Sequence, residues 1–444
     1  MKKLSVKIGS ILLALAMTAS LSACSNNSTT SESKSSSSDE KITLSVMHMF
    51  PKSNTDGNSI AYNKALDEFK KANPNIIINE EALGNNTYET KIAAVAAGNQ
   101  LPDLFIYKGS MLDMFINNKL INAVDDVLDK DPEWKNGFYD GIFNDFVKDG
   151  KTYGIPFQKL DTHLIFYNTK IFNDVGISEF PTTWAGFVDA IKKIKAKGIT
   201  PISLGNKDNW VAESCILSTL ADRFTGPDWF DSIKNKGGAK FTDPEFVQAL
   251  TTLQELAKMG AFNSDMNSLD NMQQKTAYYN GKAAMFMEGN WAISSVVNDA
   301  PKEISENTSL AILPAVDGGK GDPLDNSAGA AWSWNVNANV TGAKRDAAFK
   351  FIKAVTDSHY ATIAVENNAF PASKPEKVDN SKLASLSVKY LDISAKFKPV
   401  PIYDSQLPAD LINVMNTGIQ SLMINKMTPQ ELAQKIQAAY EASK

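Results

Sequence analysis

The start of the chain alternates between two hydrophobic patterns, and this alternation limits the fold more than any other feature. Short apolar runs, which predict strands, are Ile42–Met47, Ile76–Ile78 and Leu104–Tyr107. Between them, apolar residues recur at helical spacing in 61–72 and 87–97, which Pro74 and Gly98 follow. The continuous run at Ile76–Ile78 is typical of a strand buried on both faces. Strand, helix, strand, helix, strand predicts a parallel sheet with helical crossovers.

A second α/β unit follows the first along the chain. Strand-like runs recur at Ile165–Tyr167 and Ile202–Leu204, and helix starts recur at Thr183 and at Asp243-Pro244. Since a domain holds about 100–200 residues, a chain of 444 residues is expected to form two lobes. In open α/β sheets, ligands bind beyond the carboxyl ends of the strands. Two such lobes facing each other would make a cleft that closes by hinge motion.

The first 40 residues predict a processed leader and a tether. Lys2, Lys3 and Lys7 precede a short apolar run and small residues, which together describe a secretory signal peptide over residues 1–23. Residues 25–40 are rich in serine and contain no apolar residue, so we expect them to be disordered. The sequence Leu21-Ser22-Ala23-Cys24 resembles a bacterial lipobox. That resemblance implies cleavage before Cys24 and acylation of its thiol and amine, which anchors a protein to a membrane. A plain signal peptide with an incidental cysteine is the alternative.

Charge and cysteine content exclude some classes of protein. A formal net charge of -5 gives no reason to expect nucleic-acid binding. Beyond the leader, Cys215 is alone, so we expect a buried thiol and no structural disulfide. The histidines lie far apart in sequence, and no metal-ligand spacing is present. We expect no metal, no cofactor and a monomer.

Four groups of segments resemble a known family from about residue 41 to the C-terminus. They are Ala65–Phe69 with Asn73-Pro74; Ala97–Leu104; Gly154–Pro156 with Tyr167-Asn168 and Pro181–Trp184; and Tyr279–Met285 with Glu288–Trp291. In this order and spacing they resemble the extracellular solute-binding proteins of carbohydrate-uptake ABC importers, similar in plan to maltose-binding protein. The resemblance implies an α/β fold of two lobes, each a mainly parallel sheet flanked by helices, with the ligand cleft between them.

The resemblance also implies how the chain divides and what it binds. The first crossing between lobes is expected near 156–161. One lobe is expected to hold 41–157 plus about 312–370, and the other 158–311 plus about 371–444, with 24–40 as the lipidated cysteine and tether. The implied partners are a small-molecule carbohydrate, the membrane permease subunits of an importer, and the membrane through Cys24. The location is then the outer face of the cytoplasmic membrane, in a cell of Gram-positive type.

Aromatic side chains next to acids and amides are the candidates for sugar contact, because rings cover C–H faces and planar polar groups bind hydroxyls. The family places a stacking tryptophan at the position of Trp291, with Glu288 and Asn290 beside it. Trp210 lies in a polar loop after a predicted strand. Trp332 and Trp334 lie two apart, on one face of a predicted strand. Core packing is the alternative for each tryptophan, and helix capping for Glu288 and Asn290.

Further candidates follow other strands or lie at the expected crossing. Relatives carry sugar-binding groups near the positions of Asp161 and, after the third strand, Tyr107 and Lys108; the remaining candidates by place are His163, His48, Asp404 and Gln406. Two departures from the family remain. The first strand ends in Met47-His48-Met49-Phe50, which leaves the first-loop contact open. Leu411 and Ile412 stand where maltose-binding protein has another stacking tryptophan, which argues against assuming a maltodextrin.

Other functions remain open from sequence alone. An exported glycosidase would use two carboxylates at a set separation, which sequence cannot show. A binding protein for a polyol, peptide, polyamine or glycerol phosphate would share the fold, although a phosphate or carboxylate ligand favours arginine clamps, and this chain has few arginines. An adhesive surface lipoprotein is a third alternative. The motifs G-x-S-x-G, H-E-x-x-H and the P-loop are all missing from the sequence. We therefore expect a non-enzymatic protein that captures an oligosaccharide by lobe closure.

Overall fold

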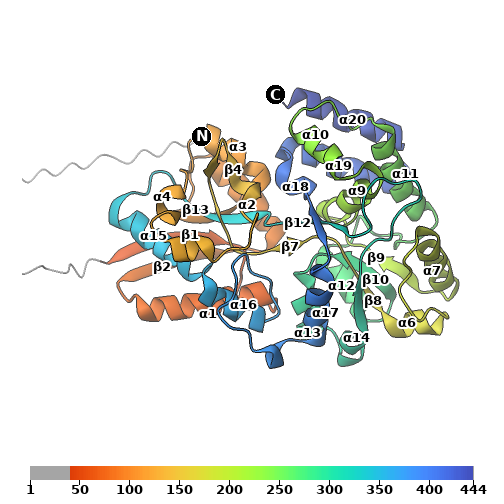
Figure 1. The fold of residues 1–444 in the computed structure, drawn as a ribbon, viewed down its shortest axis with the longest axis horizontal. Coiled ribbons are helices and arrows are strands. Elements are labelled where there is room, and N and C mark those ends of the chain that lie inside the picture. The colour runs from red at the N-terminus through yellow and green to blue at the C-terminus, as the bar shows by residue number, and fades with distance from the viewer. Residues whose placement is uncertain (1–40, 444) are drawn as a thin grey trace, which may run out of the picture. The chain divides into compact units, whose positions relative to one another are not determined.

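The first sheet brings together strands from three distant stretches of the chain (Figure 1). The computed structural model describes residues 41–443. The strand order is β2 (Ile76–Ala82), β1 (Ile42–His48), β3 (Leu104–Lys108), β13 (Trp332–Val336) and β6 (Ile155–Pro156). β1 lies parallel to β2 and β3, which confirms the crossovers predicted for this part of the chain. β13 lies antiparallel to β3 and β6, so the whole sheet is mixed.

Strand β2 differs from the prediction made from its apolar run. Its burial alternates over the first residues, and Ile77 is 39% exposed. Within residues 41–443, β2 lies at an edge of the sheet and pairs with β1 alone. The prediction of a strand buried on both faces is therefore wrong, because one face of this edge remains open to solvent.

The second sheet has the order β11 (Thr308–Ala311), β8 (Leu164–Asn168), β10 (Ala283–Glu288) and β9 (Thr200–Ser203). β10 lies parallel to β9 and antiparallel to β8, and β11 lies antiparallel to β8. The two-lobe α/β fold is as predicted, but "mainly parallel" does not describe this sheet. β8 enters directly from the other lobe, so no helical crossover within its own sheet sets its direction.

Helices cover both sheets. Those that pack with the first sheet are α1 (Gly57–Ala72), α2 (Asn85–Ala97), α3 (Leu112–Asn117), α4 (Asp125–Leu128), α5 (Pro132–Asn136), α15 (Gly342–Ala354) and α16 (Ser358–Glu366). Those whose side chains share the core of the second lobe with its sheet are α6 (Thr169–Asp174), α7 (Trp184–Ala196), α8 (Trp210–Ala212), α9 (Ser218–Thr225), α10 (Pro227–Lys234), α11 (Pro244–Lys258), α12 (Asn271–Tyr279), α13 (Ala292–Asp299), α14 (Lys302–Glu306), α17 (Ser385–Ser394), α19 (Ala409–Met423) and α20 (Pro429–Ala442). Within 41–443, every helix is too short or too polar to cross a bilayer.

Two bodies of buried side chains define the lobes. The first lobe has a core drawn from 44–160 and 330–372, with Ile402. The second lobe has a core drawn from 164–316, 386–390 and 403–436. Trp291 packs against the core clusters of both lobes. These two cores do not test the lobe boundaries that the resemblance predicts, so those boundaries stay a prediction.

A small three-stranded sheet joins the lobes. Its order is β14 (Lys398–Val400), β12 (Asp325–Gly329) and β7 (Leu160–Asp161). β12 runs antiparallel to β7, with Ala328 opposite Asp161, and parallel to β14. β7 follows the first stretch of the first core and precedes β8 of the second sheet. These strands, together with the short helix α18 (Tyr403–Gln406), lie where the chain passes between the two cores.

Candidate functional site

A cavity of about 660 Å³ opens between the two lobes. Both lobes lie in one compact unit that begins at Lys41. The first lobe contributes the loop after β1, the starts of α1 and α2, the end of β3 and the start of β13. The second lobe contributes α8, α12 and α13 with the turns before them. The volume is within the range of pockets that enclose small-molecule ligands.

Three tryptophans line the cavity, and they come from both lobes. Trp210 begins α8 and Trp291 lies in the turn after β10; their ring centroids are 6.1 Å apart, with an angle of 52° between the planes. Trp332 opens β13 of the first lobe. Flat apolar rings on both walls can cover the two faces of a sugar ring. Trp334, two residues further along β13, instead packs in the first core against Tyr62 and Phe351.

Lys108 and Asp404 form a buried ion pair at the cavity wall. The Nζ of Lys108 lies 2.7 Å from the Asp404 carboxylate and 3.6 Å from that of Glu89. Burial alone would lower the pKa of Lys108, but these two carboxylates raise it above its usual value. The same ammonium lies 5.7 Å from the centre of the Trp332 ring, a cation–π distance. Lys108 and Asp404 both line the cavity, and their contact with a ligand stays a prediction.

Asp161 and Asn290 lie near the crossing and do not line the cavity. The Tyr390 hydroxyl donates to the Asp161 carboxylate, and the Asn290 amide donates to the same hydroxyl at 2.9 Å and to the backbone of Lys159. Burial raises the pKa of Asp161, and the Tyr390 bond lowers it in part. These side chains tie α17 to β7 and to the turn after β10, so in this structure they hold the crossing together.

Tyr107, His48 and His163 are buried with partners inside the protein. The Tyr107 hydroxyl donates to the backbone of Tyr153 at 2.8 Å. His48 pairs with Glu80 at 3.2 Å and accepts from the backbone of Phe50. His163 lies between Cys215 and Leu313 of the second lobe. The structure does not bring these three side chains to the cavity, because each is buried among partners in the protein interior.

Glu288 and Gln406 also lie outside the cavity lining. Glu288 is fully buried and accepts from the Trp291 indole at 2.7 Å. Gln406 donates to Asp145 of the first lobe at 3.1 Å and accepts from Lys234. Cys24, the predicted lipidation site, lies outside the described residues.

Several cavity residues were missed by sequence reasoning. They are polar side chains near helix starts or on the crossing segment: Asn58, Gln158, Ser214, Asn271 and Lys275. Asn58 lies in the first turn of α1, and Asn271 is the first residue of α12. The rule that helix starts face the cleft at strand ends could have identified these two. Gln158 and Ser214 carry no such signal.

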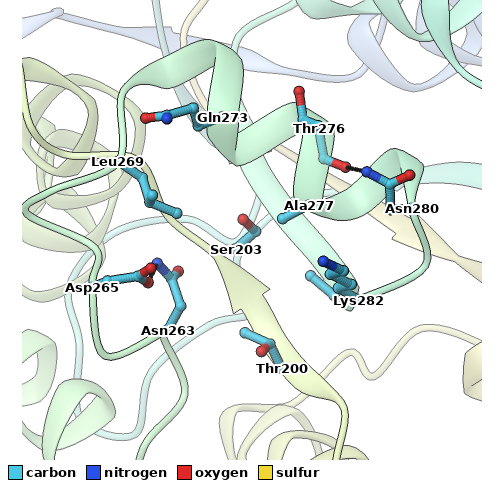
Figure 2. A pocket seen from close by; sticks show the side chains of 11 residues that line it. Thr200, Ser203, Asn263, Asp265, Leu269, Gln273, Thr276, Ala277, Asn280 and Lys282 are labelled. Atoms are coloured by element: carbon cyan, nitrogen blue, oxygen red, sulfur yellow. Dashed lines mark hydrogen bonds between the residues drawn. The ribbon is translucent and has the colours of Figure 1, made fainter.

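A second, smaller hollow of about 320 Å³ lies within the second lobe (Figure 2). Its lining is mostly short or polar, including Thr200, Asn263, Asp265, Gln273 and Lys282. The Asn263 amide donates to the Asp265 carboxylate at 2.7 Å, so two of the polar side chains that line this hollow are already bonded to each other. Its lining contains no aromatic ring, so it lacks the flat surface that a sugar face requires. Among the described residues, no cluster of three or more His, Cys, Asp or Glu side chains could hold a metal ion.

Two α/β lobes joined by crossing strands around one aromatic-walled cavity define a cleft-type binding protein. The family model of bacterial extracellular solute-binding proteins matches residues 52–361, and this chain belongs to that family. An uncharacterized ABC transporter extracellular-binding protein of Pyrococcus horikoshii is 23% identical over 63% of this chain; the match spans 62% of that protein, less than two thirds of its length.

Two other relatives match over most of their length. The melibiose/raffinose/stachyose-binding protein MelE of Bacillus subtilis is 23% identical over 93% of this chain and 92% of its own. A solved structure described under xylan utilization by the thermophilic bacterium Caldanaerobius polysaccharolyticus is 28% identical, with a TM-score of 0.81, and covers 90% of this chain and 100% of its own. The family model confirms the expected assignment to extracellular solute-binding proteins, and the solved structure shares the two-lobe fold.

Proposed function

We propose that this protein captures a neutral oligosaccharide outside the cell and delivers it to the permease subunits of an ABC importer. The observation that carries the proposal is the presence of Trp210, Trp291 and Trp332, from both lobes, around one cavity. A ligand that touches both walls binds the closed arrangement of lobes better than an open one, and so shifts the population toward it. The closed form is then the one that docks on the importer.

The charges at the cavity favour a neutral ligand. Three lysines line it: Lys108 is paired with Asp404, Lys275 lies 3.4 Å from the Glu288 carboxylate, and Lys207 is exposed to solvent. Neither of the two buried ammonium groups is left to neutralise a phosphate or carboxylate, and burying an uncompensated anion is costly. The lining contains no arginine. The relatives support a sugar: one is named for melibiose, raffinose and stachyose, and another was described under xylan utilization.

Most of the acids at the cavity serve structure, which argues against a glycosidase. Asp56 accepts from the backbone and hydroxyl of Ser59 at the start of α1, and Asp270 caps α12 through Gln273. Asp404 is paired with Lys108, which also lies 3.6 Å from Glu89, and Asp299 accepts from the Thr55 hydroxyl. A hydrolase needs two carboxyl groups available to the scissile bond, and five of the six acids that line the cavity are committed to these partners.

We further propose that Cys24 carries a lipid anchor and that 25–40 tether the binding domain to the outer face of a membrane in a cell of Gram-positive type. The lipobox-like sequence before Cys24 supports this. The test is metabolic labelling with palmitate: label should co-purify with the wild-type chain, and Cys24→Ser should abolish it and release the protein into the medium. Label retained in Cys24→Ser would overturn the proposal.

The function is tested by titrating the purified processed chain with neutral oligosaccharides, monosaccharides, polyols, peptides and glycerol phosphate. Tryptophan fluorescence and melting temperature report binding, since a ligand that binds only the folded state raises the melting temperature. Trp210→Ala and Trp332→Ala should each weaken binding by about 30-fold, the effect of losing a central aromatic contact. Trp229→Phe, whose indole bonds to Asp243 outside the cavity, is the matched control. A rise in melting temperature with peptides or glycerol phosphate alone would contradict the proposed sugar ligand. Cleavage of the sugar during the titration would support the glycosidase alternative.

A further inference from the structure

Glu288 ends β10 with its side chain fully buried, directly beneath the cavity wall. Its carboxylate lies within reach of three donors: the Trp291 indole N–H at 2.7 Å, the Gln274 amide at 3.2 Å and the Lys275 ammonium at 3.4 Å. A buried carboxylate is costly without such partners. The group is therefore stable here only while these donors stay in place, and one of them belongs to the tryptophan in the cavity.

The indole N–H is the only polar group of the Trp291 side chain, and a hydrogen bond to a charged acceptor is stronger than one to a neutral acceptor. With Nε1 fixed to Glu288, rotation of the ring about its side-chain bonds breaks that contact. The carboxylate thereby selects one orientation of the ring.

Gly289 holds the same ring from the backbone side. A Cβ atom built on Gly289 would lie 2.0 Å from Cζ3 and 2.4 Å from Cη2 of Trp291. Real side chains do not approach so closely, so the six-membered part of the indole rests directly on the Gly289 backbone. Trp210 lies alongside, at 6.1 Å between ring centroids. Three neighbours thus surround a ring that also lines the cavity.

We propose that Glu288 is a positioning residue for ligand binding: it holds the Trp291 ring in the orientation that receives the ligand, with Lys275 as its counter-ion. This rests on the proposed function of the cavity. It assigns Glu288 a role through Trp291 in place of direct contact with sugar hydroxyls, because Glu288 does not line the cavity. A ring already held in place spends less conformational entropy on binding, which raises affinity through pre-organisation.

The test is a double-mutant cycle of Glu288→Gln and Trp291→Phe with a bound oligosaccharide found in the titration above. Glu288→Gln keeps an acceptor and removes the charge; we expect it to weaken binding about 5-fold. Trp291→Phe keeps a ring and removes the N–H. In the Trp291→Phe background, Glu288→Gln should cost little more, since the bond it weakens is already gone. An equal loss in both backgrounds, or no loss in either, would overturn the proposal.

A second readout needs no ligand. The indole N–H resonance of Trp291, assigned by its loss in Trp291→Phe, should move in the Glu288→Gln spectrum, while the resonances of Trp134 and Trp229 stay in place. An unmoved resonance would overturn the proposal even if sugars bind. If the wild-type chain binds no sugar yet the resonance moves, the proposed function fails and the fixing of the ring stands. Lys275→Met, which removes the counter-ion alone, covers the case in which Glu288→Gln fails to fold and should move the same resonance.

Discussion

The Lys108 ammonium lies 2.7 Å from the Asp404 carboxylate, and the two residues belong to different parts of the fold. Lys108 ends β3 of the first sheet, whereas Asp404 follows Tyr403, which packs in the second core. Directly after Lys108, a Cβ built on Gly109 would meet the Ser405 backbone oxygen at 2.4 Å. The pair and this close backbone contact fix α18 against the first lobe beside the cavity.

Removing either member of this pair should destabilise the protein, and the two losses should differ. Lys108→Met leaves Asp404 beside the buried Glu213 with no cation between them; burial and the Asp404 charge already raise the pKa of Glu213. We expect Lys108→Met to cost about 3–5 kcal/mol, the usual effect of leaving a buried charge unpaired. Asp404→Asn leaves Lys108 with Glu89, so its cost should be smaller. Melting temperatures measure both, and the double variant should be more stable than Lys108→Met alone.

Contacts between the loop after β1 and α13 should set how long a ligand stays bound. The Asn298 amide donates to the Thr55 backbone at 2.7 Å, and the Thr55 hydroxyl donates to Asp299 at 2.7 Å. These bonds join the lobes at the rim of the cavity. Asn298→Ala should raise the dissociation rate about 3–10-fold and change the association rate little, as interface substitutions mostly do. Asn307→Ala, which removes a bond of similar length to Glu303 within one lobe, is the control. An equal change in both variants would contradict the prediction.

Periodicity and turn signals could predict most of the elements but not their direction in the sheets. For β1, β2 and β3, the alternation of strand and helix patterns was enough to predict their parallel pairing, because a helix connects each strand to the next. β8 and β13 enter from the other lobe, and no local pattern reports the direction of such a strand.

The site was predictable in part for a related reason. Trp210, Trp291, Trp332, Lys108 and Asp404 come together at one cavity. Tyr107 and Lys108 are adjacent and both buried, yet only the second reaches the cavity. Which of two neighbours faces the cavity depends on the register of the strand, and a shift of one residue reverses every side chain. A short apolar strand that is buried on both faces gives no alternation from which to read that register.

Asp222 in α9 and Asp325 at the start of β12 form a pair of acids that should make stability fall as pH rises. Burial, followed by the negative charge of Asp325, raises the pKa of Asp222 to about 8. Between its ordinary pKa near 3.8 and about 8, the folded protein therefore holds a proton that the unfolded chain releases, and this contribution to stability decreases across that window. Asp222→Asn should stabilise the protein by about 1–2 kcal/mol at pH 8 and by less at pH 5. Melting temperatures at both values measure this, with the exposed Asp228→Asn as the control. A gain that is the same at both pH values would contradict the prediction.

His163 should produce the opposite dependence at acid pH. Its Nδ1 lies 2.5 Å from the Cys215 carbonyl oxygen, and the Leu313 N–H donates to its Nε2 at 3.0 Å. Only the neutral ring with its proton on Nδ1 satisfies both neighbours, and burial lowers the pKa of His163 to about 4 from 6.5. Between these values the unfolded chain binds a proton that the folded protein does not, so stability is lost as pH falls, by about 3 kcal/mol in all. His163→Gln should be less stable at pH 7 but lose less on acidification from pH 7 to 4.5. The control is His359→Gln, at an exposed histidine that is bonded to Glu68. Apart from the contribution of that surface pair, this variant should lose as much stability over this pH range as the wild-type protein. If His163→Gln keeps the full wild-type dependence on pH, another group must bind the proton.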